Sequence, residues 1–319
     1  MAAEQLEQDA PRNGAASDSA FREAALRDAG THDAAGHIPL ADAQARPAHG
    51  AIRIDDVVKT YGTGADAVMA VDHCSLDIPA GEICMVVGPS GCGKTTLLNA
   101  IAGFHDITSG RIDLDGEMLC GPGRPQATPG SDRVVVFQNG ALFPWKTTLE
   151  NICFGPRMRG VETRRAIEER ARAMMADAGL SGTEASYPEQ LSSGTRRRVE
   201  IVRALMMEPK VLLFDEPYRA LDSLTRSVMH EALLQVWYRN RVTIFFITHD
   251  LEEAVFLGHR LVVMTARPAR PKQVLEVDIP HPRDYAVLTS PRFRELMAQA
   301  GALVHDEARK SFAAGDVER

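Results

Sequence analysis

Short apolar runs, separated by glycine, proline and charged residues, recur along the chain from residue 51 onward. Apolar and polar residues alternate around Cys74, Leu76 and Ile78, a spacing typical of a strand with one buried face. Runs such as residues 211–214 and 242–247 are almost continuously apolar, which indicates strands covered on both faces. The expected strands are residues 52–54, 74–78, 83–87, 111–114, 133–137, 211–214, 242–247, 260–264 and 274–279. The pattern predicts an α/β fold.

Helical patterns lie between these runs. We expect helices at residues 95–102, 164–178, 196–207 and 293–304. Two of them fall between the strands that end at residue 137 and begin at residue 211, which predicts a helical subdomain inserted at about residues 140–207. No apolar run approaches the roughly 20 residues that a bilayer-spanning helix needs, so the chain is not expected to cross a membrane itself.

Composition separates the first residues from the rest. Residues 1–50 contain 15 alanines, eight acidic residues and four basic residues, with few large apolar ones. Such a segment buries too little to order itself, so we expect a disordered acidic tail with a short helix at residues 19–27. Residues 51–265 are then expected to form the main domain, and residues 266–319 a C-terminal extension.

Charge and cysteine content exclude several classes of protein. The net charge is −7, from 36 basic and 43 acidic residues, which argues against a general nucleic-acid binder. Five scattered cysteines fit neither a disulfide framework nor a zinc site. The first residues lack the basic and then apolar order of a secretory signal, so a cytoplasmic protein is expected.

A glycine-rich segment carries the strongest chemical signal. The stretch from Gly88 to Thr95 reads GPSGCGKT and fits the pattern GxxxxGK[ST] between a predicted strand and a predicted helix. Glycines let backbone N–H groups face phosphate oxygens, Lys94 can reach the terminal phosphates, and Thr95 can ligate Mg²⁺. A chance glycine-rich turn is the alternative, and the strand and helix on either side argue against it.

Two adjacent carboxylates follow the apolar strand at residues 211–214. Asp215 suits coordination of Mg²⁺, and Glu216 suits the polarisation of an attacking water molecule, because phosphoryl transfer depends on positioning and a base. Such a pair at a strand end can be coincidental. Together with the upstream loop it predicts a P-loop NTPase.

Further motifs give the chain a family resemblance over about residues 52–265. The segment Leu191-Ser-Ser-Gly-Thr195 resembles the signature of the ATP-binding subunits of ABC transporters. Gln138 resembles the glutamine of their Q-loop, Asp222 closes a segment similar to their D-loop, and His249 resembles their switch histidine. Taken singly, Ser192 would serve equally as a helix N-cap and His249 as an ordinary histidine at a strand end.

The resemblance implies a P-loop NTPase with a mixed, largely parallel central sheet, an antiparallel β subdomain and the inserted helical subdomain. It implies an ATPase with ATP and Mg²⁺ as cofactors, and it assigns three groups of residues. The catalytic residues are Glu216, His249, Lys94 and Gln138, and the Mg²⁺ ligands are Thr95, Gln138 and Asp215. The ATP-binding residues are Tyr61, Gly88, Pro89, Ser90, Gly91, Cys92, Gly93, Lys94, Thr95, Thr96, Ser192, Ser193, Gly194 and Asp222. Among these, Tyr61 is expected to stack on adenine, and a packed strand-end tyrosine is the alternative.

The resemblance also implies partners. Two copies are expected to pack head to tail, with each ATP between residues 88–96 of one chain and residues 192–194 of the other. Two integral-membrane permease subunits would receive the dimer at the cytoplasmic face of the inner membrane, with a solute-binding protein outside. Phe143 and Trp145 follow Gln138 in the loop that would contact the permease, and local core packing is an equally good interpretation of both.

Residues 137–145 and the stretch after residue 265 look like the nitrate, sulfonate and taurine importer group. A soluble ABC-type ATPase that drives a machine other than a transporter is the main alternative, although the chain has neither a long coiled-coil insertion nor a second ATPase unit. Three residues depart from the family pattern: Ser193 and Thr195 in the signature, and Arg219 where a small residue is usual. ATP hydrolysis is expected to persist because the catalytic set is complete.

Overall fold

The computed structural model describes residues 49–219 and 221–313. The predicted acidic tail up to residue 48, including its short helix at residues 19–27, lies outside these residues, as do residues 314–319 of the predicted extension. Among the helices of the described part, none combines the length and apolar character needed to span a bilayer.

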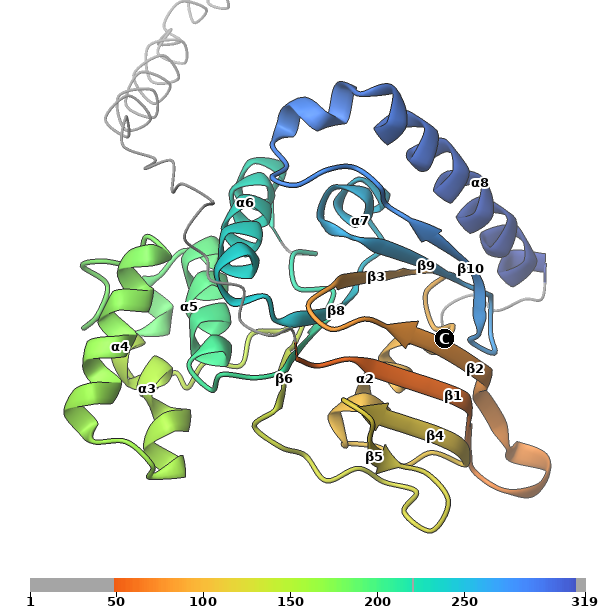
Figure 1. Cartoon of the computed structure of the whole chain (residues 1–319), viewed down its shortest axis with the longest axis horizontal. Coiled ribbons are helices and arrows are strands. Elements are labelled where there is room, and N and C mark those ends of the chain that lie inside the picture. The colour runs from red at the N-terminus through yellow and green to blue at the C-terminus, as the bar shows by residue number, and fades with distance from the viewer. Residues whose placement is uncertain (1–48, 220, 314–319) are drawn as a thin grey trace, which may run out of the picture. The chain divides into compact units, whose positions relative to one another are not determined.

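One of the two sheets in this part of the chain is antiparallel (Figure 1). It has the order β2-β1-β4-β5. Its strands are β1 (Ile52–Tyr61), β2 (Val68–Ile78), β4 (Ser109–Leu114) and β5 (Glu117–Cys120). Ile52 of β1 lies opposite Ile78 of β2 and Leu114 of β4, and all three side chains are buried. The expected antiparallel β subdomain is confirmed.

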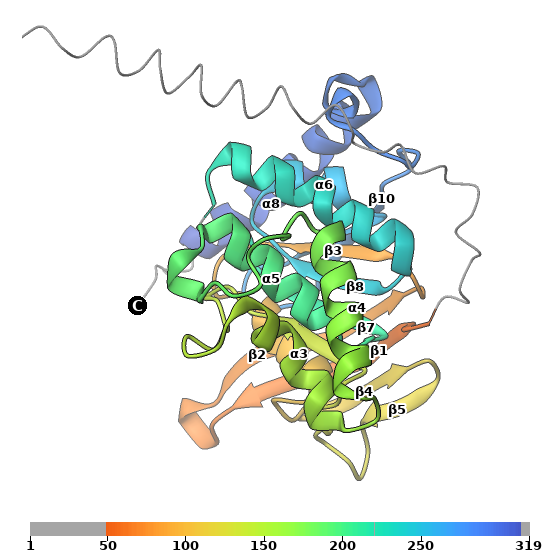
Figure 2. The ribbon, with the colours of Figure 1, turned by 90° about the vertical axis from the view of Figure 1, so that its left-hand side faces the viewer.

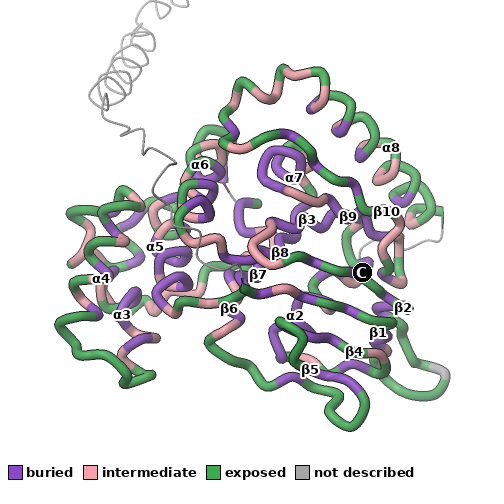
Figure 3. Tube along the Cα trace, viewed as in Figure 1, coloured by how far each residue is buried: buried purple, intermediate pink, exposed green. Residues whose placement is uncertain are grey.

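The other sheet is mixed and largely parallel, as expected. Its order is β10-β9-β3-β8-β7-β6, and every pair is parallel except β9 with β10. The strands are β3 (Ile83–Val87), β6 (Arg133–Val136), β7 (Val211–Asp215), β8 (Thr243–Ile247), β9 (Arg260–Met264) and β10 (Pro271–Glu276). Every residue of β3 and β8 is buried, which accounts for their continuous apolar sequence (Figure 3). The carboxyl ends of the parallel strands therefore lie at one edge of the sheet.

Helices cover both faces of this sheet and form the inserted subdomain (Figures 1 and 2). They are α2 (Lys94–Ala102), α3 (Thr148–Arg159), α4 (Arg164–Asp177), α5 (Ser193–Leu205), α6 (Ser223–Asn240), α7 (Leu251–Leu257) and α8 (Pro291–Ala313). Helix α2 lies between the two sheets, where Leu97 and Ile101 pack with residues of both. Helices α6, α7 and α8 cover the opposite face of the mixed sheet. Helices α3, α4 and α5 have a core of their own around Ile152, Met175 and Val199.

The structure differs from the sequence-based expectation at the last strand. The predicted strand at residues 274–279 is instead β10, which ends at Glu276. Leu275, Val277 and Ile279 are all buried, so the alternating pattern is real. Glu276 lies opposite Arg260, the first residue of β9, and beyond this pair one hydrogen bond joins the N–H of Val277 to the carbonyl of His259 at 2.9 Å. The predicted closing helix at residues 293–304 is the longer α8. Strand β5 and helices α3, α6 and α7 were not predicted as individual elements.

A buried arginine holds the segment after β10 against the end of α7. Arg283 is 6% exposed, and its guanidinium donates only to backbone carbonyl oxygens. The acceptors are those of Val255, Phe256, Gly258, Val277 and Ile279, at 2.7–3.2 Å. Burial lowers the pKa of Arg283 to about 10, so it stays protonated at neutral pH. One side chain thus satisfies carbonyls at the end of a helix and beyond a strand.

Two neutral histidines lie beside this arginine. The rings of His259 and His281 are stacked with centroids 4.5 Å apart, and Trp237 packs against both. Burial, with the nearby positive charge of Arg283, lowers the pKa of His259 to about 4 and that of His281 to about 3. Both rings are therefore uncharged in the folded chain at neutral pH.

Stability is expected to fall on mild acidification because of these rings. The unfolded chain, with ordinary histidine pKa values near 6.5, takes up protons that the folded chain excludes, so the free energy of unfolding falls as the pH drops from about 6.5 toward about 4. Going from about pH 7.5 to about pH 5.5 should remove about 1 kcal/mol for each histidine. Urea unfolding at both pH values measures this loss in the free energy of unfolding. His281→Phe should make the loss smaller, whereas His305→Gln, at an exposed position, should not; equal losses in all three proteins would contradict the assignment.

Candidate active site

The glycine-rich loop connects β3 to α2, as the sequence predicts. Gly93 has a φ of 120° and precedes the first residue of α2, and a Cβ at this position would come within 2.3 Å of the carbonyl oxygen of Ala70. Gly91 also has a positive φ, of 70°. Only glycine fits Gly93 without displacing backbone, so the loop can turn tightly into the helix and leave its N–H groups at the helix start for an anion.

Lys94 lies within this loop rather than in solvent. Its side chain is 6% exposed, and Nζ donates to the carbonyl oxygens of Gly88 and Pro89, at 2.8 Å each. Cys92 is close by, with Sγ 3.8 Å from Nζ, and burial raises the pKa of its thiol. The loop residues 88–96 therefore bring together a cation and a helix N-terminus, which suits the phosphates of a nucleotide.

Thr95 and Asp215 meet across the edge of the sheet. Thr95 Oγ1 donates to Asp215 Oδ1 at 3.2 Å, although the two residues are 120 positions apart. Burial raises the pKa of Asp215, and the charge of Glu216 adds to this, while the Thr95 hydrogen bond and Lys94 oppose it. A hydroxyl and a carboxylate side by side are the oxygen ligands that Mg²⁺ takes when phosphates and water complete its shell. Within the described residues no group of three or more His, Cys, Asp or Glu side chains could hold a metal.

Glu216 and His249 are adjacent because β7 and β8 are paired. Asp215 lies opposite Ile247, so the residues that follow the two strands emerge together. Glu216 Oε2 is 3.5 Å from His249 Nδ1. Glu216 has a φ of 46°, in the left-handed region that non-glycine residues rarely adopt, and its N–H donates to the carbonyl of Ile247 at 3.0 Å. Such backbone is typical of functional sites, and here it directs the carboxylate toward the histidine.

Tyr61 lies next to the loop, at the end of β1. Its hydroxyl is 2.9 Å from His105 Nδ1 and 3.5 Å from Thr96 Oγ1, and its ring lies 4.7 Å from Lys59 Nζ. The ring is 37% exposed, so one side is available for a ligand. His105, which orients this tyrosine, was missed by the sequence analysis because it belongs to no motif and reaches Tyr61 only through the fold.

The loop after β6 is tied to α5. Gln138 follows the strand that pairs with β7, so it leaves the same edge of the sheet as Asp215. Arg197 of α5 donates to the carbonyl oxygens of Phe137 and Gln138, at 2.8 Å each, and to Glu200 at 2.6 Å. Both charged side chains are buried, and burial raises the pKa of Glu200. This arrangement was not predicted, although Arg197 and Glu200 are three positions apart on the predicted helix, a spacing that puts them on one face.

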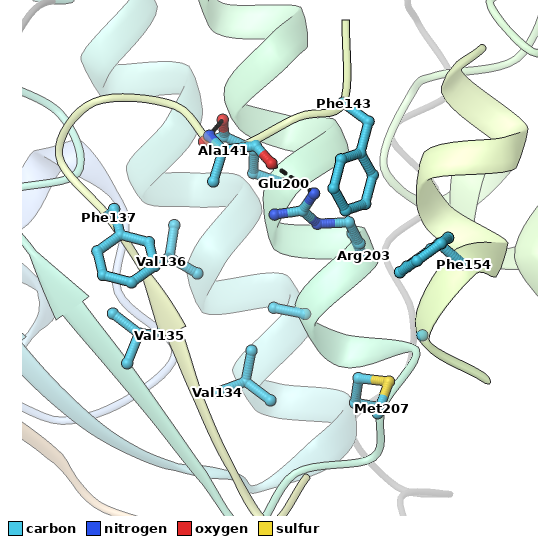
Figure 4. Close-up of a pocket in the computed structure, with 12 residues that line it drawn as sticks. Val134, Val135, Val136, Phe137, Ala141, Phe143, Phe154, Glu200, Arg203 and Met207 are labelled. Carbon is cyan, nitrogen blue, oxygen red and sulfur yellow. Dashed lines mark hydrogen bonds between the residues drawn. The ribbon is translucent and has the colours of Figure 1, made fainter. Parts of the chain in front are cut away.

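A cavity of about 340 Å³ opens beside this loop (Figure 4). Phe143 and Phe154 line one side, with ring centroids 4.7 Å apart, and Arg203 lies over the Phe143 ring and donates to the carbonyl of Ala141. Phe143 is thus packed locally, and the buried Asn151 holds its backbone through both its N–H and its C=O group. Trp145 is 70% exposed. Of the two aromatic residues that the sequence left undecided, only Trp145 presents its ring to solvent.

The signature residues do not reach the glycine-rich loop within one chain. Ser192 caps α5 by accepting from the N–H of Thr195 at 3.1 Å, and Ser193 is exposed. Gly194 is buried where a Cβ would be 2.6 Å from Thr225 of α6. In the described chain no hydrogen bond joins residues 192–194 to residues 88–96, and Figure 1 places α5 beside α3 and α4, away from α2. This half of the predicted ATP site would have to come from a second copy.

Asp222 caps α6. Its carboxylate accepts from the N–H and the hydroxyl of Thr225, at 2.9 and 2.7 Å, and these hydrogen bonds lower its pKa. Its contact with nucleotide stays a prediction.

Comparisons with known proteins agree with this geometry. Residues 71–219 match the family model described as ABC transporter. The chain is 43% identical over 245 residues to the taurine import ATP-binding protein TauB of Rhizobium johnstonii, which covers 75% of this chain and 90% of that protein. It is 40% identical over 258 residues to the nitrate import ATP-binding protein NrtD of Synechococcus elongatus, covering 79% of this chain and 90% of that one. An uncharacterized ABC transporter ATP-binding protein of Methanocaldococcus jannaschii is 40% identical over 260 residues, or 82% of this chain and 93% of its own length.

Solved structures are similar as well. A dimeric post-hydrolysis state of an ATP-binding cassette, bound to ADP and Pi, superimposes with a TM-score of 0.62 at 28% identity. The match covers 72% of this chain and all of that one.

Proposed function

The chain belongs to the ATP-binding subunits of ABC transporters, and from this premise we propose that it is the ATPase that powers import of a small solute through a membrane permease. The proposal rests on two contacts at the edge of the sheet where the glycine-rich loop lies. Thr95 is hydrogen-bonded to Asp215, and the Glu216 carboxylate lies 3.5 Å from His249. The solute is proposed to be an anion or zwitterion such as nitrate, a sulfonate or taurine, because relatives at 37–43% identity are import subunits for these compounds.

Each residue has a proposed role in ATP hydrolysis. Lys94 and the N–H groups of the loop bind the β- and γ-phosphates, and Tyr61 stacks on adenine. Thr95, Gln138 and Asp215 would hold Mg²⁺, which neutralises the charge that develops on the phosphates. Glu216 is proposed to orient the water that attacks the γ-phosphorus, and His249, whose Nδ1 is 3.5 Å from the Glu216 carboxylate, is proposed to act at the same phosphate.

The second half of the site is proposed to come from another copy of the chain. Ser192, the N-cap of α5, and Ser193, its first residue, are both exposed, and the helix N-terminus with the Ser192 hydroxyl is proposed to meet the γ-phosphate held by a partner. The exposed position of Ser193 gives its side chain no clash within the chain. Nucleotide between two copies would favour a closed dimer, and hydrolysis would weaken it.

Permease subunits are proposed to dock beside the Gln138 loop. The cavity there is lined mainly by apolar side chains. Trp145 is exposed, and its ring lies 5.6 Å from that of Phe143, which lines the cavity. Docking at this place would hold the chain at the cytoplasmic face of the membrane as a peripheral subunit, with a solute-binding protein supplying the cargo outside.

Copurification tests this proposal. Membranes of cells that make the protein would be extracted in mild detergent, the full chain pulled down, and its companions identified. A multispanning protein is expected with the wild-type chain and severalfold less of it with Trp145→Ala, because a large exposed ring at a docking surface contributes strongly to binding.

Val161→Ala is the matched control, because Val161 is also 70% exposed but lies beyond the end of α3. This variant should retain the permease. Recovery of the chain only with soluble ribosomal or assembly proteins would support the alternative of a soluble ABC-type ATPase and would contradict the import function.

A further inference from the structure

An arginine contacts the carboxylate that is proposed to orient water. Arg219 Nη1 donates to Glu216 Oε2 at 3.1 Å. The backbone closes the same turn, since the N–H of Arg219 donates to the carbonyl of Glu216 at 3.3 Å. Arg219 stands where the family resemblance leads one to expect a small residue.

The turn that carries both residues is anchored at each end. The N–H of Glu216 is fixed by the carbonyl of Ile247, and Tyr218 is buried with its ring centroid 5.7 Å from that of Phe246. With the backbone held between these anchors, the two side chains start close together. The ion pair is therefore favoured by the fold and does not depend on a chance meeting of two long side chains.

Arg219 and His249 both approach the same oxygen of the Glu216 carboxylate. Among residues 49–219 and 221–313, Oε2 accepts from Arg219 and lies 3.5 Å from His249 Nδ1. Arginine keeps its charge at every physiological pH, so the pairing is permanent as long as the geometry holds. A carboxylate oxygen that already accepts from a guanidinium has less capacity to accept a hydrogen bond from water.

We propose that Arg219 is a positioning residue that restrains hydrolysis in the single chain by occupying the Glu216 oxygen that would otherwise accept from the attacking water. The inference rests on the proposed ATPase function. The guanidinium is 53% exposed and the carboxylate 15%, so the pair is partly screened by solvent and can be broken. Closure of a second copy over this exposed turn would draw Arg219 away and release Glu216.

Steady-state ATPase assays on the full chain, diluted so that it stays monomeric, test the restraint. Arg219→Ser should raise kcat about two- to fivefold, the range over which exposed ion pairs shift equilibria, with KM for ATP unchanged within about twofold. Arg219→Lys keeps the positive charge and should stay closer to wild type. Arg165→Ser is the matched control, because it removes an arginine from an exposed ion pair with Glu169 on α4 and should leave the rate unchanged.

The same substitution in a Glu216→Gln background separates the inference from a general structural effect. Since Arg219 acts through the Glu216 carboxylate, Arg219→Ser should have no effect on the residual rate of Glu216→Gln. A kcat that is unchanged or lower in Arg219→Ser, or an equal rise in both backgrounds, would overturn the inference while leaving the ATPase proposal intact. A wild-type rate that Glu216→Gln does not reduce would instead overturn the role of Glu216, and the restraint with it.

Discussion

Replacing Glu216 by glutamine is expected to lower the turnover number for ATP by about 10²-fold or more, the usual loss when a positioned general base is removed. The amide keeps the size of the side chain and its contact with Arg219 but loses the negative charge that orients and polarises water. ATP affinity should change little, because the phosphates are proposed to be held by Lys94 and the loop. Phosphate release measures the rate, and binding of a fluorescent ATP analogue measures the affinity.

Glu252→Gln provides the control for this experiment. Glu252 is an exposed carboxylate in the first turn of α7, three residues beyond His249, so the same chemical change is made close to the site but outside it. Its rate should equal that of wild type. If Glu216→Gln retained the wild-type rate, the base would have to be another group.

Replacing Arg283 by leucine is expected to lower the free energy of unfolding by about 3 kcal/mol or more, because each buried carbonyl oxygen left without a donor costs about 1–3 kcal/mol. Leucine fills part of the space but donates no hydrogen bond, so five buried carbonyl oxygens at the end of α7 and beyond β10 lose their donor. Urea unfolding followed by circular dichroism measures the change.

Arg292→Leu is the comparison for this stability measurement. Arg292 pairs with Asp278 and Glu295 at the start of α8, but these side chains are 41–66% exposed, so its loss should cost far less than the loss of Arg283. Equal losses in the two variants would show that the carbonyl network around Arg283 contributes no more than a surface ion pair.

Local sequence was sufficient to predict the nucleotide half of the site. Lys94 and Thr95 follow a fully apolar strand, and Asp215 and Glu216 end another, so their chemistry could be placed at strand ends without any tertiary information. The adjacency of Thr95 and Asp215 then follows from the parallel sheet, which brings the carboxyl ends of β3, β8 and β7 together. The continuous apolar runs likewise predicted strands covered on both faces, and the helical patterns between residues 137 and 211 predicted the inserted subdomain.

Contacts made by residues outside motifs were not predictable. Arg283 lies in a proline-rich stretch where the sequence suggests a surface loop, and only the packing of the C-terminal segment on α7 buries it. Helix α6 was missed because its apolar residues do not gather on one side strongly enough to signal a helix, although Asp222 is an ordinary N-cap at its start. His105 and Arg197 act on residues 44 and 59–60 positions away, distances that no local pattern spans.

The hydrogen bonds from Arg197 to the Gln138 loop couple this loop to helix α5. One helix, α5, is capped by Ser192. Its Arg197 holds the carbonyls of Phe137 and Gln138, and its Glu200 and Arg203 line the cavity proposed for the permease. Any ligand that shifts this helix therefore alters both places at once. Linkage then requires reciprocity: if bound ATP strengthens attachment of the permease by a given factor, the permease must strengthen the binding of ATP by the same factor. A membrane partner so coupled would act as an effector of nucleotide affinity as well as a recipient of the motion that hydrolysis produces.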